Sequence, residues 1–302
     1  MKTDDIVPDS EARGLIGALP PYLRPYASLM RLDRPIGAWL LFWPGAWSVA
    51  LAGLGPRGFA LIAWLGLGAW AMRSAGCVYN DIIDRELDSR VERTRLRPLA
   101  SGRVSLSGAW TLLVALSLIG LLVLLKLNRI SQVVALASLV PVALYPFMKR
   151  ITWWPQAWLG LVFSWAALVG WPAVTGEIAP TMVLLYAGSI AWVIGYDTIY
   201  ALQDKEDDAL VGVKSSALAL GPRARLGIAG FYLVALALWA FALCCERPDG
   251  LALVALAPMA GHLGWQVVSL KPDDGSDALA KFRSNRFAGL LMFLACLVTG
   301  TS

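Results

Sequence analysis

The sequence predicts an all-α membrane protein that crosses the bilayer several times. Of its residues 58% are hydrophobic and 16% are charged, and the mean hydropathy is +0.62. Soluble domains are about 45–50% apolar and about 25% charged.

A helix needs about 20 apolar residues to cross the hydrocarbon core. Nine such segments follow one another along the chain, at residues 36–54, 59–79, 107–125, 130–148, 153–172, 181–200, 224–244, 250–270 and 286–301. We therefore expect nine transmembrane helices in one membrane-embedded domain, residues 1–302, with residues 1–30 as a cytosolic N-terminal segment.

The basic residues indicate how these helices are oriented. Twenty-one of the 26 Lys and Arg residues lie before the first segment or in linkers that follow even-numbered segments, and four lie in the other linkers. In membrane proteins the cytosolic linkers carry the excess of Lys and Arg. The distribution predicts a cytosolic N-terminus and an external C-terminus. It also argues against a nucleic-acid groove. The basic residues that raise the pI to about 9.1 are spread over the N-terminal stretch and four linkers, and they do not gather in one place.

Two acidic motifs lie at the cytosolic ends of the second and sixth segments. The first runs from Asn80 through Asp84 to Asp88, and the second runs from Asp197 through Tyr200 and Asp204 to Asp208. If the helices continue, Asn80, Asp84 and Asp88 share one helical face, and so do Asp197, Asp204 and Asp208.

Clustered carboxylates repel one another and are costly near hydrocarbon, so a cation is expected to balance them. Mg²⁺ fits this demand, because it prefers carboxylate, phosphate and water oxygens. The alternative is that both motifs are merely solvated linkers that end helices. Two motifs with matching positions favour a site that holds magnesium and a diphosphate group.

Several cations fit the same kind of site. Arg73 lies inside the second segment, two turns deeper than the first motif, and an ionisable residue in a membrane helix is by default a candidate functional residue. Arg34 precedes the first segment, and Lys149 and Arg150 follow the fourth. A guanidinium can bind a phosphate or carboxylate with two hydrogen bonds. For each of these residues the alternative is a charge that only sets the topology or reaches the membrane surface.

At these residues the chain resembles the UbiA family of intramembrane aromatic prenyltransferases. The resemblance covers nearly the whole sequence, with the pattern NDxxDxxxD after the second segment and DxxYAxxDxxxD after the sixth. The stretches 31–44, 97–102, 145–150 and 196–216 resemble the 4-hydroxybenzoate polyprenyltransferase branch of that family.

The resemblance implies a reaction. In it a polyprenyl group passes, with Mg²⁺, from polyprenyl diphosphate to the ring carbon ortho to the hydroxyl of 4-hydroxybenzoate, in ubiquinone biosynthesis. The implied cavity opens to the cytosol and sideways to membrane lipid, and the implied location is a bacterial inner (cytoplasmic) membrane. The runner-up functions are another aromatic or haem prenyltransferase and, in a different class, a divalent-cation or organic-anion transporter. Acidic residues at one membrane face, and not at the midplane, argue against transport.

The resemblance also implies roles for individual residues. Metal binding falls to Asn80, Asp84, Asp88, Asp204 and Asp208. Asp84, Asp204 and Asp208 are also implied in catalysis, with Arg150 as an essential arginine. Substrate contacts fall to Arg34, Arg73, Asn80, Lys149, Asp197 and Tyr200. Which arginine meets the aromatic carboxylate is left open.

Overall fold

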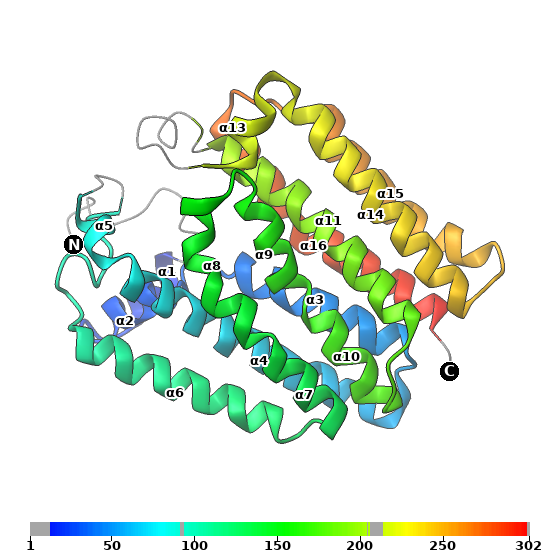
Figure 1. The fold of residues 1–302 in the computed structure, drawn as a ribbon, viewed down its shortest axis with the longest axis horizontal. Coiled ribbons are helices and arrows are strands. Elements are labelled where there is room, and N and C mark those ends of the chain that lie inside the picture. Colours follow the sequence, from blue (N-terminus) through cyan, green and yellow to red (C-terminus); the bar gives the residue numbers. More distant parts are fainter. Residues whose placement is uncertain (1–12, 91–93, 204, 206–213, 301–302) are drawn as a thin grey trace. The chain divides into compact units, whose positions relative to one another are not determined.

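A computed structural model describes residues 13–90, 94–203, 205 and 214–300, and all regular elements in these ranges are helices, as predicted (Figure 1). Their bounds are α1 Arg13–Ala18, α2 Arg24–Leu29, α3 Ile36–Leu51, α4 Gly55–Ile83, α5 Arg85–Arg90, α6 Leu106–Leu124, α7 Arg129–Ala137, α8 Leu139–Ile151, α9 Pro155–Ser164, α10 Ala166–Thr175, α11 Pro180–Gln203, α13 Ser216–Leu220, α14 Ala224–Glu246, α15 Leu251–Ser269 and α16 Gly275–Thr299.

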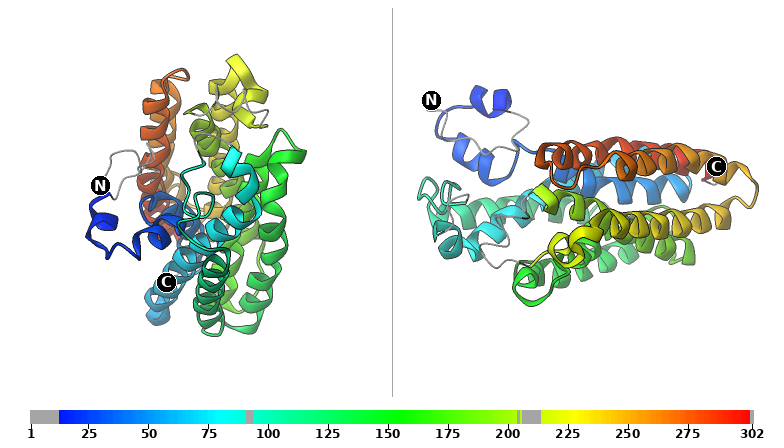
Figure 2. Two further views of the ribbon diagram at one scale, coloured as in Figure 1. Left: turned by 90° about the vertical axis from the view of Figure 1, so that its left-hand side faces the viewer. Right: turned by 90° about the horizontal axis from the view of Figure 1, so that it is seen from above.

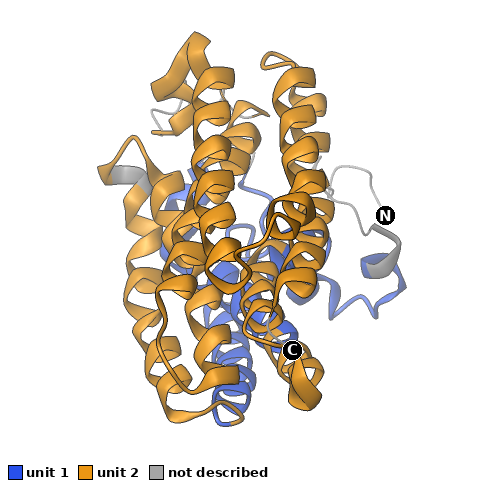
Figure 3. Ribbon diagram, turned by 90° about the vertical axis from the view of Figure 1, so that its right-hand side faces the viewer, with its two compact units in different colours: residues 1–39, 66–125 blue, residues 40–65, 126–302 orange. Residues whose placement is uncertain are grey.

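The chain divides into two compact units (Figure 3). The first comprises residues 1–39 and 66–125, and the second comprises residues 40–65 and 126–302. In the first unit α2, the second half of α4 and α6 share an apolar core. Leu29, Val78 and Leu116 are its buried contributions from these three helices.

The second unit is organised around α11, which contacts α9, α14 and α16. The most apolar stretch of α11 is 67% buried, the highest share among the candidate membrane helices. Helix α15 contacts α14 and α16, and Figure 2 shows α15 and α16 running side by side. Because α11 carries the start of the second acidic motif, the best-packed helix of this unit positions those residues.

Three fully buried indoles form the centre of the second unit. The ring centroid of Trp47 lies 5.0 Å from that of Trp192 and 5.4 Å from that of Trp239. The Trp47 Nε1–H donates to the backbone carbonyl of Gly289 over 2.8 Å, so the polar atom of this large side chain has a partner. These contacts join α3, α11, α14 and α16.

Seven helical stretches of the described ranges are long and apolar enough to cross a membrane, and a shorter apolar helix covers Ile36–Leu51. A protein that crosses the membrane several times is therefore supported. The seven stretches overlap seven of the nine predicted segments. The two remaining predicted segments are the first and the last. The first, 36–54, corresponds to the short helix α3, and the last, 286–301, lies within α16, whose first half is charged.

Two helix boundaries differ from the predicted ones for identifiable reasons. The predicted segment 130–148 is interrupted at Ser138, because Pro141 lacks the N–H that would bond the carbonyl of Ala137. Helix α16 begins at Gly275, well before the predicted residue 286, because the Asp274 carboxylate caps it by accepting from the N–H groups of Ser276 and Asp277. Hydropathy alone missed this start, since the first turns of α16 are charged.

Candidate active site

The first acidic motif continues the helix that precedes it, as predicted. Helix α4 runs to Ile83, and the N–H of Asp84 bonds the carbonyl of Asn80 over 2.9 Å. The N–H of Asp88 in turn bonds the carbonyl of Asp84 over 2.8 Å. These helical hydrogen bonds put Asn80, Asp84 and Asp88 on one face. The side chain of Asp84 is fully buried, that of Asp88 is nearly so and Asn80 is half-buried.

The neighbouring carboxylate, Asp81, lies at the centre of an ion-pair network that the sequence did not reveal. Arg31 Nη2 donates to both Asp81 oxygens, at 2.7 and 2.9 Å. Arg97 Nη1 lies 3.3 Å from Asp81 Oδ1 and 2.8 Å from Asp88 Oδ2, so one guanidinium nitrogen bridges two carboxylates of the motif. Burial raises the pKa of Asp88 above its usual range, and the positive charge of Arg97 acts in the opposite direction.

Arg31 adopts an unusual backbone conformation. Its φ is +58°, the only positive φ among the non-glycine residues of the described ranges. A side chain in this left-handed region costs roughly 1–2 kcal/mol. Such strain persists only where surrounding contacts fix it, and here the fixing contact is the ion pair with Asp81.

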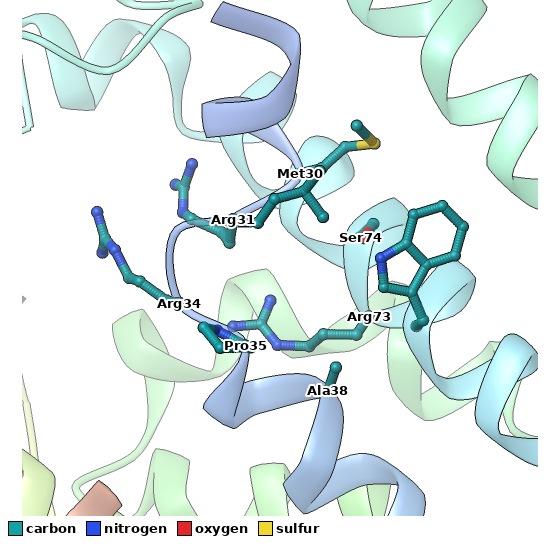
Figure 4. Close-up of a pocket in the computed structure, with 9 residues that line it drawn as sticks. Met30, Arg31, Arg34, Pro35, Ala38, Arg73 and Ser74 are labelled. Atoms are coloured by element: carbon teal, nitrogen blue, oxygen red, sulfur yellow. The ribbon is translucent and has the colours of Figure 1, made fainter. Parts of the chain in front are cut away.

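A cavity of about 280 Å³ lies within the first unit, beside the loop that joins α2 to α3. Its lining includes three arginines, Arg31, Arg34 and Arg73, together with the indole of Trp70 and the hydroxyl of Ser74. Figure 4 shows Arg73 reaching from α4 toward the start of α3, while Arg34 extends from the loop. The predicted substrate residues Arg34 and Arg73 therefore line one pocket, and a guanidinium is a group that can bind an anion.

A glycine makes room for Arg73. A Cβ built on Gly37 would lie 2.5 Å from Arg73 Nε and 2.9 Å from Nη2, so a side chain at that position would require the guanidinium to move. At its other edge the guanidinium contacts Cys77 Sγ through Nη1. The intramembrane charge is thus packed directly against the backbone of α3.

The second acidic motif begins on α11. Asp197 and Tyr200 both lie in this helix, which extends to Gln203, whereas Asp204 and Asp208 lie outside the described residues. Beside Asp197, the buried hydroxyls of Thr198 and Ser216 are 2.7 Å apart. This hydrogen bond fixes the start of α13 to α11.

Aromatic rings surround the same end of α11. The ring of Tyr200 lies 4.6 Å from that of Phe282 in α16, and the ring of Tyr196 lies 5.8 Å from it. Tyr196 also packs edge-on against Trp192 at 4.9 Å. Aromatic faces attract cations, and the two rings of this cluster that are partly exposed are those of Tyr200 and Phe282.

Lys149 and Arg150 lie near the end of α8, and their side chains are outside the described part of the structure. Their predicted roles stay predictions.

The side chains of the first motif fit a hard divalent cation. One amide and two carboxylates offer oxygen atoms from a single helical face, and oxygen is the ligand that Mg²⁺ prefers. Across the ranges that the structure describes, no three His, Cys, Asp or Glu side chains form a cluster that encloses a metal by itself. A cation held here would complete its shell with phosphate oxygens, water or the Asp residues outside those ranges.

The helices of the described ranges, the buried acidic helix end and the arginine-lined pocket are features expected of an intramembrane enzyme that binds an anionic substrate. The UbiA prenyltransferase family model matches residues 41–297 of this chain. The chain therefore belongs to the UbiA prenyltransferase family, and the prediction of an enzyme that transfers prenyl groups is confirmed.

Relatives and solved structures agree with this assignment. The chain is 45% identical over 296 residues to the mitochondrial 4-hydroxybenzoate polyprenyltransferase of Arabidopsis thaliana, covering 97% of this chain and 72% of that protein. A UbiA homologue from Aeropyrum pernix superimposes with a TM-score of 0.71 at 26% identity, covering 86% of this chain and 97% of that one. A UbiA homologue from Archaeoglobus fulgidus, bound to GPP and Mg²⁺, shares the fold with a TM-score of 0.64 at 17% identity, covering 91% and 99% of the two chains.

The predicted location in a bacterial inner membrane is wrong on this comparison. The Arabidopsis protein and the relatives from mosquito, nematode and rat are all named as mitochondrial. The physical reason for the error is that the bias of Lys and Arg orients helices relative to a membrane but does not say which membrane it is. The multi-pass character of the chain is unaffected.

Proposed function

We propose that this chain transfers a polyprenyl group from polyprenyl diphosphate to 4-hydroxybenzoate, at the ring carbon ortho to the hydroxyl, as a step of ubiquinone biosynthesis. The observation that carries the proposal is the buried face of Asn80, Asp84 and Asp88 on a chain that is 45% identical to a 4-hydroxybenzoate polyprenyltransferase. The mitochondrial names of the relatives support a mitochondrial membrane as its location.

The departing diphosphate is the group whose charge the protein must stabilise most, because it leaves with both electrons of the C–O bond. Asn80, Asp84 and Asp88, with Asp204 and Asp208, would hold Mg²⁺, which neutralises the departing diphosphate when bound. Arg34 and Arg73 line one pocket, and their guanidiniums would stabilise the charge that develops on the departing diphosphate. Lys149 and Arg150 would add positive charge for the diphosphate or for the carboxylate of the acceptor.

The allylic cation left behind needs protection until the aromatic ring attacks it. The partly exposed rings of Tyr200 and Phe282 supply π faces near Asp197. A site within the bilayer keeps water from quenching the cation and leaves the long prenyl tail in lipid. The acceptor's ortho carbon then bonds the cation, and the ring loses a proton.

The metal requirement gives the direct test. Detergent-solubilised protein is mixed with labelled 4-hydroxybenzoate and geranyl diphosphate, with either Mg²⁺ or EDTA. We expect prenylated benzoate with Mg²⁺ and none above background with EDTA, because a free diphosphate is a poor leaving group. Re-addition of Mg²⁺ after EDTA is the control for inactivation. If Mg²⁺ produced no product, even with a longer prenyl donor, the proposed acceptor would have to be abandoned.

We also propose that nine helices cross the membrane and that the acidic motifs face the side richest in Lys and Arg, where the cavity opens to water and sideways to lipid. Helix α3 has 16 residues, a rise of roughly 24 Å at 1.5 Å per residue, which a locally thinned bilayer accommodates. Helix α16 has 25 residues, and its second half is apolar.

The orientation can be measured with single cysteines in a protein whose four native cysteines have been replaced. Ser101→Cys lies in a linker on the proposed basic side, and Asp249→Cys lies between α14 and α15 on the other. In sealed vesicles of known orientation, an impermeant maleimide should label one variant from outside and the other only after inversion. Labelling of both from the same side would contradict the topology.

A further inference from the structure

We propose that Asp81 is a positioning residue and not a metal ligand: through Arg31 it holds the loop that bears Arg34, and it shares Arg97 with Asp88. The inference rests on the proposed function, in which Arg34 contacts the diphosphate and Asp88 the metal.

The hydrogen bonds of Asp81 account for both of its oxygens. Oδ2 accepts from Arg31 at 2.9 Å, and Oδ1 accepts from Arg31 at 2.7 Å and from Arg97 at 3.3 Å. The side chain is 1% exposed, so these contacts lie away from water. A metal at Asp81 would have to displace charge-assisted bonds from two partly buried arginines, which makes this carboxylate a poor ligand although it lies inside the motif.

The bond to Arg31 fixes the direction of the loop. Arg31 is held with its φ at +58°, and its Nη1 also donates to the carbonyl of Ser28 over 3.1 Å. The N–H of Arg34 bonds the carbonyl of Arg31 over 3.0 Å, so the two residues belong to one turn. Both line the same cavity, as Figure 4 shows. Release of Arg31 from Asp81 would free the strained turn and move Arg34 with it.

The bond to Arg97 extends the network to Asp88. Arg97 Nη1 bridges Asp81 and Asp88, and the N–H of Arg97 bonds the carbonyl of Thr94 over 2.9 Å. Thr94 in turn donates its hydroxyl to the backbone carbonyl of Asp88 over 3.0 Å. The segment from Thr94 to Arg97 is therefore bound to Asp88 at its backbone and at its carboxylate. Asp81 is therefore the carboxylate that pairs with both Arg31 and Arg97.

The test is a double-mutant cycle of Asp81→Asn and Arg31→Gln. For each variant, direct binding of geranyl diphosphate, its KM, kcat and the half-saturating Mg²⁺ concentration are measured. We expect each single variant to weaken diphosphate binding and raise its KM about tenfold, the loss of one charge-assisted contact. The half-saturating Mg²⁺ concentration should stay within about twofold of wild type, because Arg97 and Thr94 still hold Asp88 directly, at 2.8 and 3.0 Å. The double variant should be no worse than the more impaired single variant, since both substitutions remove the same Arg31–Asp81 ion pair.

Controls separate positioning from folding. Arg31→Lys keeps the charge and should restore part of the affinity, which a purely structural loss would not do. The exposed pair Arg247 and Asp249, whose Nε and Oδ2 are 3.0 Å apart, offers matched variants, Arg247→Gln and Asp249→Asn. Neither should change KM by more than about twofold, as expected of a surface ion pair. Melting temperatures in detergent identify any variant that fails to fold.

A rise of tenfold or more in the half-saturating Mg²⁺ for Asp81→Asn alone, or effects of the two substitutions that multiply, would overturn the inference and make Asp81 a ligand. If the proposed function were wrong, the wild-type protein would bind geranyl diphosphate without prenylating 4-hydroxybenzoate. The direct measurement of geranyl diphosphate binding to the variants would then still decide the role of Asp81. A wild type that binds no geranyl diphosphate would overturn both.

Discussion

Asp84→Asn is expected to lower the rate of prenyl transfer about a thousandfold while leaving the protein folded. Asp84 is fully buried, and helical backbone bonds align it between Asn80 and Asp88. The amide has the shape of the carboxylate but no charge, so it binds a divalent cation weakly. Losing the electrostatic stabilisation of the leaving diphosphate costs about 4 kcal/mol, which corresponds to that rate. The measurement is kcat with saturating geranyl diphosphate and 4-hydroxybenzoate, across a Mg²⁺ titration.

Glu86→Gln provides the matched control, because Glu86 lies two residues further along and is exposed to solvent. Its removal takes away the same charge from the same short stretch, and the rate should stay within about twofold of wild type. If Asp84→Asn retained more than a tenth of the wild-type rate, Asp84 would not be the central ligand of the motif.

Trp47→Ala is expected to produce the largest loss of stability. The indole is fully buried between Trp192 and Trp239, and its N–H satisfies the carbonyl of Gly289. Truncation opens a cavity in the middle of the second unit, and such changes cost about 3–5 kcal/mol. Unfolding in detergent, followed by near-ultraviolet circular dichroism, should shift to lower temperature or lower denaturant concentration.

Trp110→Ala is the comparison for that experiment, since Trp110 is 46% exposed on α6. In a micelle its ring contacts detergent, and its loss should cost well under half as much. Equal shifts for the two variants would show that the three-indole cluster is not the centre of stability that its burial indicates.

The sequence predicted those parts of the site that depend on local periodicity. The common face of Asn80, Asp84 and Asp88 follows from spacing along one helix, and the structure has it. The pairing of Arg31 with Asp81 joins residues 50 positions apart, and no spacing rule along the chain reports such a contact. A weak signal existed, because Asp81 stands inside the motif and both arginines lie in stretches that resemble the family.

The limits of the helix prediction have a similar origin. Apolar windows found the helices but not the first turns of α16, where Lys281 is buried and its ammonium pairs with Asp277 at 2.5 Å. A charged residue lowers the hydropathy of a window whether it faces water or an ion partner. The cap at Asp274 was the local cue to the true start.

The close packing of Gly37 against Arg73 has an evolutionary consequence. The two positions form an epistatic pair, because the guanidinium occupies the volume that any side chain at residue 37 would need. A lineage that first loses the arginine is free to acquire a side chain at 37. In the opposite order, alanine at residue 37 would push the guanidinium of Arg73 out of its present position. Among diverging descendants of this chain, the glycine should therefore be lost more often after the arginine than before it.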